Sequence, residues 1–352
     1  MTSWKIYKLG DIAKFQTGKL NSNAAIENGK YPFFTCSPTT LAIDDYAFDK
    51  EAILLAGNNA EGNFSIKYFK GKFNAYQRTY IIETKNDICD IKFLFYALKI
   101  CLHQFKQMSQ GTSTKFLTAV ILNNFEISLP SLEEQRRIAG ILGAIDDKIE
   151  NNRRINANLE SQAQALYKQW FVDNRSDDWE KRKLESIIDI GSGKGLARID
   201  FVEDGLYPIL GANGQIGRTN NFLIDKKDNV LFTGRVGTLG NVFRLQQKRA
   251  WLSDNTLIIA PKKKYYNYVY FFLKSSNLKD FNVGSTQPLI RQSDIKEMDI
   301  LIPDYLTLEA FENKCIAMFD KINQANAEID SLATLRDTLL PKLMNGEIKI
   351  DE

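Results

Sequence analysis

The chain has 352 residues, of which 44% are hydrophobic and 25% charged, with a formal net charge of +3. This length is sufficient for two domains of ordinary size, and the composition excludes disordered and fibrous classes of protein. No apolar run approaches the roughly 18–20 residues of a membrane span, and the first residues lack the layout of a signal peptide, so we expect a cytoplasmic protein without a membrane partner.

The residue types that usually carry catalysis or bind metals are sparse. His103 is the single histidine, which argues against catalytic triads, histidine metal clusters and imidazole proton relays. The four cysteines form no CxxC pair, so we expect reduced thiols rather than a zinc site or a disulfide framework. We therefore expect no metal, no cofactor bound by this chain and no catalytic residue.

In chain order, the first feature is a stretch that returns later. The segment "WKIYKLGDIAKFQTGK" at 4–19 is similar to "WEKRKLESIIDIGSGK" at 179–194. Further matches follow in the same order: 52–63 with 229–241, 93–99 with 268–274, and 111–130 with 284–303. Ordered matches of this kind predict a tandem duplication of a unit of about 175 residues.

Each copy begins with short β-type runs, glycine- and asparagine-rich turns and one aromatic helix. The glycine-rich stretch "DIGSGKG" at 189–195 is no phosphate-binding loop, because Ile188 replaces the required first glycine and Gly195 the required hydroxyl residue. No Pro-Pro occurs, so the amine-binding signature of amino-methyltransferases is absent. We interpret the stretch as a framework turn that places Lys19 and Lys194 equivalently in the two copies.

A long helix is predicted in each copy after the β-rich part, from Leu132 to about Phe171 in the first copy, and Pro341 is expected to kink or end the second helix. Apolar residues recur at heptad spacing in both helices. They are Ile138, Leu142, Ile145, Ile149, Leu159 and Leu166 in the first helix, and Met318, Ile322, Ile329, Leu332 and Leu339 in the second.

Such long helices need a partner, so we expect the two to form an intramolecular antiparallel coiled coil. Ordinary core packing is the alternative interpretation. In the coiled coil, Asn152, Asn156 and Arg336 would fix the register at a cost in stability.

Polar loops in both copies carry side chains suited to nucleic acid. Amide and guanidinium groups recognise adenine and guanine edges, whereas hydroxyls and lysines hold phosphates. Each residue alone is also typical of a solvated turn, but their occurrence in equivalent loops favours DNA binding. The candidates are Lys19, Arg78, Thr114, Lys115, Lys194, Arg235, Thr286, Gln287 and Arg291.

Five segments carry a resemblance to a known family. They are "KLGDI" (8–12), "SLPSLEEQRRIAGILGAIDDKIENNRRINANLESQAQALYKQWF" (128–171), "YPIL" (207–210), "GSTQPLI" (284–290) and "LRDTLLPKLMNGEIKI" (335–350). In these the chain resembles the specificity (S) subunit of type I restriction–modification systems. The resemblance implies an α+β fold with two tandem pseudo-symmetric α/β target recognition domains, separated by two long helices that form an antiparallel coiled coil. The expected parts are recognition domain 1 (1–131), a central conserved helix (132–175), recognition domain 2 (176–304) and a C-terminal conserved helix (305–352).

The resemblance also implies a function. Each recognition domain would recognise one half of a bipartite target in double-stranded DNA, and the helices would dock two methyltransferase (M) subunits. The M subunits bind S-adenosylmethionine, and restriction/translocase (R) subunits join the complex, while the S subunit supplies no catalytic residue. The alternative that the residues leave open is a two-headed coiled-coil scaffold that joins proteins without binding DNA.

Overall fold

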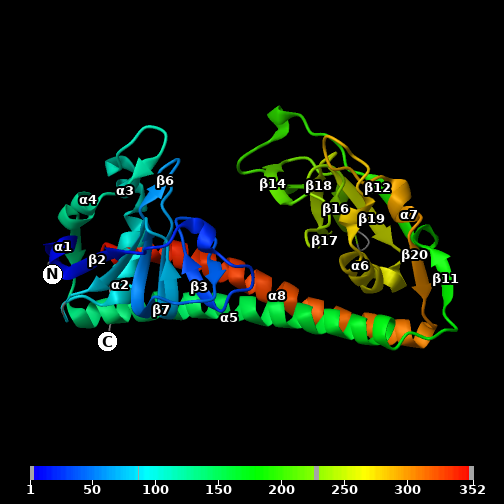
Figure 1. The fold of residues 1–352 in the computed structure, drawn as a ribbon, viewed down its shortest axis with the longest axis horizontal. Coiled ribbons are helices and arrows are strands. Elements are labelled where there is room, and N and C mark those ends of the chain that lie inside the picture. Colours follow the sequence, from blue (N-terminus) through cyan, green and yellow to red (C-terminus); the bar gives the residue numbers. More distant parts are fainter. Residues whose placement is uncertain (1–3, 86, 226–229, 349–352) are drawn as a thin grey trace. The chain divides into compact units, whose positions relative to one another are not determined.

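The structure, a computed structural model, describes residues 4–85, 87–225 and 230–348 (Figure 1). Asn229, the first residue of one matched segment, and residues 349–352, the end of the expected C-terminal helical region, lie outside them.

The chain divides into two compact units. Unit 1 comprises residues 1–151 and 328–352, and unit 2 comprises residues 152–327. Each unit contains part of both long helices, α5 (Leu132–Lys168) and α8 (Tyr305–Met344). We call the part of unit 1 outside these two helices head 1, and the corresponding part of unit 2 head 2.

Unit 1 is built on a six-stranded sheet with the strand order β2-β8-β5-β7-β3-β4. Its neighbours are antiparallel except β3 and β7, which pair in parallel, and β1 pairs separately with β10. The strands are β1 (Lys5–Lys8), β2 (Ala13–Thr17), β3 (Tyr31–Phe34), β4 (Leu41–Ile43), β5 (Phe48–Ala56), β6 (Asn58–Asn59), β7 (Ile66–Ala75), β8 (Thr79–Thr84), β9 (Lys115–Phe116) and β10 (Glu126–Leu129). The short helices are α1 (Leu9–Ile12), α2 (Ile91–Ile100), α3 (Leu102–Met108) and α4 (Ala119–Asn124).

Unit 2 repeats this topology in two four-stranded sheets, β12-β19-β16-β17 and β14-β13-β18-β15, and β11 pairs with β20. The strands are β11 (Glu180–Lys183), β12 (Ile188–Ser192), β13 (Tyr207–Gly211), β14 (Gly214–Thr219), β15 (Ile224–Asp225), β16 (Leu231–Gly234), β17 (Val242–Arg244), β18 (Arg249–Leu252), β19 (Thr256–Pro261) and β20 (Asp299–Ile302). The short helices are α6 (Tyr266–Ser275) and α7 (Gln292–Lys296). The parallel pair β3 and β7 corresponds to β13 and β18, so the long β7 of unit 1 is represented by β17 and β18 in unit 2.

The aromatic helix of each copy joins its sheet to the long helices. In unit 1, Phe93 on α2 belongs to one buried cluster with Leu142 of α5 and Leu343 of α8. In unit 2, Phe271 on α6 is buried with Phe311 of α8. Burial of each such side chain is worth about 1.5–3 kcal/mol, so the sequence's aromatic helices anchor each head to the helix segments of its own unit.

The two long helices run antiparallel, as predicted. In unit 1, Arg336 contacts Asp146 at 2.8 Å and Glu328 contacts Lys148 at 3.4 Å. A residue further along α5 therefore contacts a residue earlier in α8, which is the antiparallel order. In unit 2, Asn326 lies opposite Asn156. The predicted α+β fold with repeated domains and an antiparallel helical pair is therefore confirmed.

The ends of the long helices differ slightly from the sequence prediction. A π-helical turn, Gln169–Asp173, follows α5, so the helical stretch extends a little beyond Phe171. Pro341 lies inside α8, which continues to Met344 before Gly346 takes a left-handed φ of 72°. Pro341 therefore does not itself end the helix, and glycine supplies the termination signal.

Candidate nucleic-acid interface

Three loops of head 1 are joined by backbone hydrogen bonds. Gly57 N donates to Arg78 O at 2.8 Å, and Leu117 N donates to Gly57 O at 2.9 Å. Within the third loop, Gln110 N donates to Phe116 O at 3.1 Å. We call the loops at 57–63, 76–78 and 110–117 loop junction 1. Figure 1 shows β6, which lies in this junction, well away from the α5 segment of the same unit.

Head 2 contains the same arrangement, which we call loop junction 2: residues 234–241, 253–255 and 283–290. Arg235 N donates to Asn255 O at 2.8 Å, and Ile290 N donates to Arg235 O at 2.9 Å. The structure therefore brings together loops that are equivalent in the two copies, on frameworks with the same hydrogen bonds.

A glycine fixes the turn of the third loop in each junction. A Cβ at Gly111 would lie 2.1 Å from Thr114 O, and one at Gly284 would lie 1.8 Å from Gln287 O. Because no larger residue fits at these positions, the turn holds the polar residues that follow in one conformation. Thr286 and Gln287 are exposed there, whereas Thr114 and Lys115 are half-buried.

Lys19 and Lys194 are exposed at equivalent turns. A Cβ at Gly18 would lie 1.8 Å from Ala75 O, and one at Gly193 would lie 2.0 Å from Ser253 O. These glycines allow the backbone of the turn to pass close to the strand end beside it. The Gly-Lys turns are framework elements that present a cation, in agreement with the interpretation from sequence.

The side chain of the candidate Arg291 is already bound by another residue of head 2. Its guanidinium contacts Asp294 at 3.0 Å, and its backbone N–H donates to the same carboxylate at the start of α7. Although burial opposes ionisation, these interactions with Arg291 hold the pKa of Asp294 below its ordinary value. The equivalent residue of head 1, Thr118, also caps a helix by accepting from Ile121 N. Arg291 would have to leave Asp294 before it could contact a base.

Two exposed lysines at the junctions are absent from the sequence candidates. Lys106 donates to Asn63 at 2.9 Å and lies against Gly62, where a Cβ would meet Lys106 Cγ at 3.0 Å. Lys279 lies in the same way against Gly240, at 3.1 Å. The signal was present in the sequence, because both lysines keep the spacing of 173 residues that relates 111–130 to 284–303.

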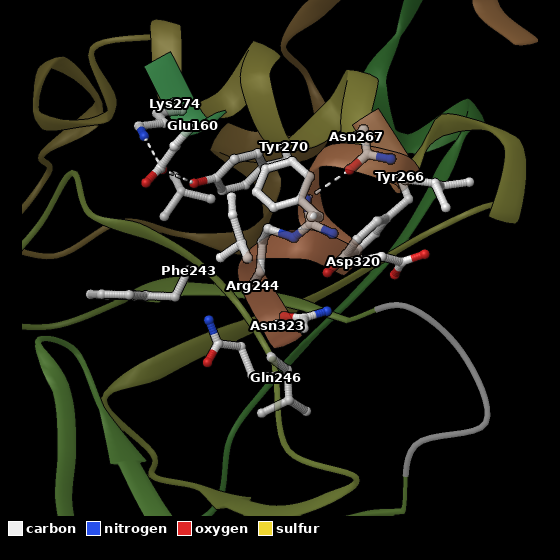
Figure 2. A pocket seen from close by; sticks show the side chains of 15 residues that line it. Glu160, Phe243, Arg244, Gln246, Tyr266, Asn267, Tyr270, Lys274, Asp320 and Asn323 are labelled. Carbon is white, nitrogen blue, oxygen red and sulfur yellow. Dashed lines mark hydrogen bonds and ion pairs between the residues drawn. The ribbon is translucent and has the colours of Figure 1, made fainter. Parts of the chain in front are cut away.

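The junction of head 2 with its helix segments contains a cavity of about 640 Å³ (Figure 2). Arg244 stands in it with its guanidinium 3.3 Å from the centre of the Phe319 ring, and donates to Asn267 at 2.8 Å. Glu160 accepts from Tyr270 at 2.9 Å and from Lys274 at 2.5 Å.

Of the charged side chains that line this cavity, Glu160 is paired with Lys274, whereas Arg244 lies against the Phe319 ring and donates to Asn267. Although burial opposes ionisation, the hydrogen bonds from Lys274 and Tyr270 keep the pKa of Glu160 below its ordinary value. These contacts hold β17 and α6 against the helix segments of unit 2, and they offer no nucleophile beside a base. The cavity is a structural junction.

The heptad residues of both helices are buried or half-buried. Ile138, Leu142, Ile145, Ile149 and Ile322 are buried, and Leu159, Leu166, Met318, Ile329, Leu332 and Leu339 are half-buried. Elsewhere on the two helices Ile141, Ile155 and Leu335 are exposed, and Ile316, also exposed, lines the cavity of unit 2.

The described residues contain no group of three or more His, Cys, Asp or Glu side chains that could hold a metal ion. The exposed His103 contacts Gln107 at 3.0 Å. None of the helices within the described ranges combines the length and the apolar run that a membrane span requires.

Comparison with known proteins relates this geometry to a family. The family model of the type I restriction modification DNA specificity domain matches residues 1–161 and, a second time, residues 176–325. The chain belongs to this family. The two matches of the specificity domain agree with the duplicated topology of the two units.

Individual relatives carry related names. The chain is 39% identical over 163 residues to the type I restriction enzyme EcoDI specificity subunit of Escherichia coli, a match that covers 46% of this chain and 35% of that protein. It is 24% identical over a 412-residue alignment to the type I restriction enzyme MjaIX specificity subunit of Methanocaldococcus jannaschii, with 99% of this chain and 94% of that protein covered. The chain thus spans about a third of the first relative's length and nearly all of the second's.

A solved structure supports the fold. The crystal structure of a type I restriction-modification system S subunit from M. genitalium matches 97% of this chain and 96% of that chain, with a TM-score of 0.65 and 20% identity.

Proposed function

We propose that this specificity-domain protein is the DNA sequence-recognition subunit of a type I restriction–modification complex. Head 1 and head 2 each recognise one half of a bipartite target through loop junctions 1 and 2. The observation that carries the proposal is that the two junctions share their backbone hydrogen bonds but differ in side chains. Equal frameworks with unequal polar groups suit two different half-sites, since base edges are distinguished by side-chain donors and acceptors.

The proposed DNA contacts divide into two kinds. Lys19, Lys194, Lys106 and Lys279 are exposed cations that would hold phosphates and position each head without sequence preference. Arginine and amide groups of the junctions would recognise bases: Arg78, Arg235 and Gln287. The hydroxyls of Thr114 and Thr286 and the amine of Lys115 would hold phosphates.

The proposed subunit acts without catalytic residues of its own. It would join two methyltransferase subunits, which would bind the S-adenosylmethionine, and restriction/translocase subunits. Residues 132–175 and 305–352 would dock these partners, and residues 1–131 and 176–304 would be the two recognition domains. Support for docking on the helices comes from exposed apolar residues outside the cavity, such as Ile141 and Leu335.

The experiment is an electrophoretic shift of a DNA fragment ladder by the complex with its methyltransferase subunits, at increasing salt. We expect this chain to be required for the shift, and binding to weaken steeply with salt because lysines and arginines release counterions from phosphates. If this chain assembles with the methyltransferase subunits and yet adds no DNA binding, it is a protein–protein scaffold.

A further inference from the structure

Arg78 is the single arginine among residues 1–131. It is exposed, and its guanidinium lies 5.3 Å from the centre of the Phe116 ring across loop junction 1. Within the part of the chain that the structure describes, this guanidinium has no ion pair and no hydrogen bond. A cation–π contact of this kind holds the guanidinium near the ring while leaving its five N–H donors available.

Head 2 contains seven arginines between residues 176 and 304. Five of them are held by partners in the structure: Arg182 by Glu180, Arg218 by Gly205 O, Arg244 by Asn267, Arg249 by Asp225 and Arg291 by Asp294. Among the described residues, the remaining two, Arg198 and Arg235, have side chains without such a partner.

Of these two, Arg235 lies in loop junction 2. Its backbone N–H donates to Asn255 O at 2.8 Å, whereas in head 1 the corresponding bond runs from Gly57 N to Arg78 O. Arg235 thus takes the place of Gly57, and Asn255 takes the place of Arg78. Each junction thus carries one uncompensated arginine, meaning one whose guanidinium has no ion pair or hydrogen bond among the described residues. In head 1 this arginine accepts the shared backbone hydrogen bond, and in head 2 it donates it.

An uncompensated guanidinium is the side chain best suited to a guanine. It can donate in parallel to O6 and N7 of a guanine in the major groove, the commonest base-specific contact. A paired arginine such as Arg291 would first have to break its ion pair with Asp294. Arg198 lacks a partner, but it lies outside the junction in a loop that also carries Asp200, Glu203 and Asp204.

Building on the proposed function, we propose that Arg78 and Arg235 are the specificity-determining residues of the two heads, each recognising a guanine in its own half-site. Because they start from opposite sides of the shared hydrogen bond, the guanine occupies a different position within each half-site. The two halves of the target therefore differ even though the frameworks are equal.

The test uses the complete complex with its methyltransferase subunits and a library of random DNA sequences, from which methylated molecules are sequenced. The variants are Arg78→Ala, Arg78→Lys, Arg235→Ala and Arg235→Lys, with Arg198→Ala as the matched control. We expect each alanine variant to reduce discrimination by about 10-fold or more at one guanine of one half-site, and the other half-site to keep its sequence. The lysine variants keep the charge but lose the fork, so they should relax the same positions with little change in non-specific binding.

The outcomes separate the two proposals. If the wild-type complex yields a bipartite target and the arginine variants keep every position of it, the assignment of Arg78 and Arg235 is wrong while the proposed function stands. Relaxation by Arg198→Ala equal to that by Arg235→Ala also overturns the assignment. If the wild-type complex methylates without any sequence preference, the proposed function itself fails. Should an alanine variant fold poorly by circular dichroism, the corresponding lysine variant decides.

Discussion

Asn156 Nδ2 on α5 donates a 2.7 Å hydrogen bond to Asn326 Oδ1 on α8. Both side chains are half-buried where the two helices of unit 2 meet. A polar pair in such a position stabilises one register, because any shift of the helices leaves both amides facing apolar neighbours.

A double-mutant cycle measures this pair. Asn326→Leu alone leaves the Asn156 amide without its partner and should lower the free energy of unfolding by about 1 kcal/mol. Asn156→Leu with Asn326→Leu replaces both polar groups and should return to within about 0.5 kcal/mol of wild type. Urea unfolding of wild type, Asn156→Leu, Asn326→Leu and the double variant provides the values. Strictly additive losses would show that the two amides do not interact.

The helix segments of unit 1 are also joined by a polar contact, which is an ion pair. Arg336 Nη1 lies 2.8 Å from Asp146 Oδ1, with side chains 19% and 30% exposed, and Tyr96 also donates to Asp146 at 2.7 Å. Burial, and then the hydrogen bond to Asp146, raises the pKa of Tyr96 above its ordinary value.

Arg336→Met should lower the free energy of unfolding by about 1–2 kcal/mol, because Asp146 loses its countercharge while partly shielded from water. The matched control is Lys148→Met, since Lys148 and Glu328 are 49% and 47% exposed and their pair should be worth less than about 0.5 kcal/mol. Equal losses in the two variants would contradict the importance of burial at Arg336.

Glu312 gives the stability of unit 2 a pH dependence. Its carboxylate accepts from Tyr268 N at 2.9 Å and from Asn267 Nδ2 at 2.8 Å, at the start of α6. Burial raises the pKa of Glu312 above its ordinary value of 4.5, against these hydrogen bonds.

The folded chain therefore keeps a proton on Glu312 at pH values where the unfolded chain has released it. The stabilisation is complete below the ordinary pKa and falls as pH rises through the raised one. We expect the unfolding free energy of wild type, minus that of Glu312→Gln, to decrease as pH rises. Urea unfolding at pH values from below 4.5 upward tests this prediction, with Glu309→Gln on the same helix as control. A difference that does not change with pH would argue against a raised pKa of Glu312.

Lys19 and Lys194 should contribute to affinity without sequence preference. Replacing both with Gln removes two phosphate contacts, so the slope of log affinity against log salt should become shallower by about 2, with equal loss on target and non-target DNA. Lys70→Gln with Lys181→Gln is the matched control, because these lysines are paired with Glu51 and Asp299. A change in preferred sequence would instead indicate base recognition by Lys19 or Lys194.

The long helices and the duplicated topology could be predicted because their signals are local and ordered. Heptad spacing predicts that Leu142 and Ile322 face a partner helix, whatever the rest of the chain does. The register of α5 against α8 could not be predicted, since the partner of Asn156 depends on how two distant segments align.

The loop junctions were only partly predictable. The sequence predicts both Arg78 and Arg235 as DNA-binding residues, but not their relationship, because the spacing between copies changes along the chain as strands lengthen or shorten. Backbone hydrogen bonds identify Gly57, and not Arg78, as the counterpart of Arg235. The ion pair of Arg291 could have been anticipated, because Asp294 stands three residues later at a helix start.

The central claim is that this chain selects the DNA sequences that its complex modifies. Genome-wide mapping of adenine methylation, with and without the gene for this chain, tests it most directly. We predict one bipartite motif, with two short defined halves separated by undefined bases, that disappears when the chain is absent. A methylation pattern that is unchanged by loss of the chain would contradict the claim.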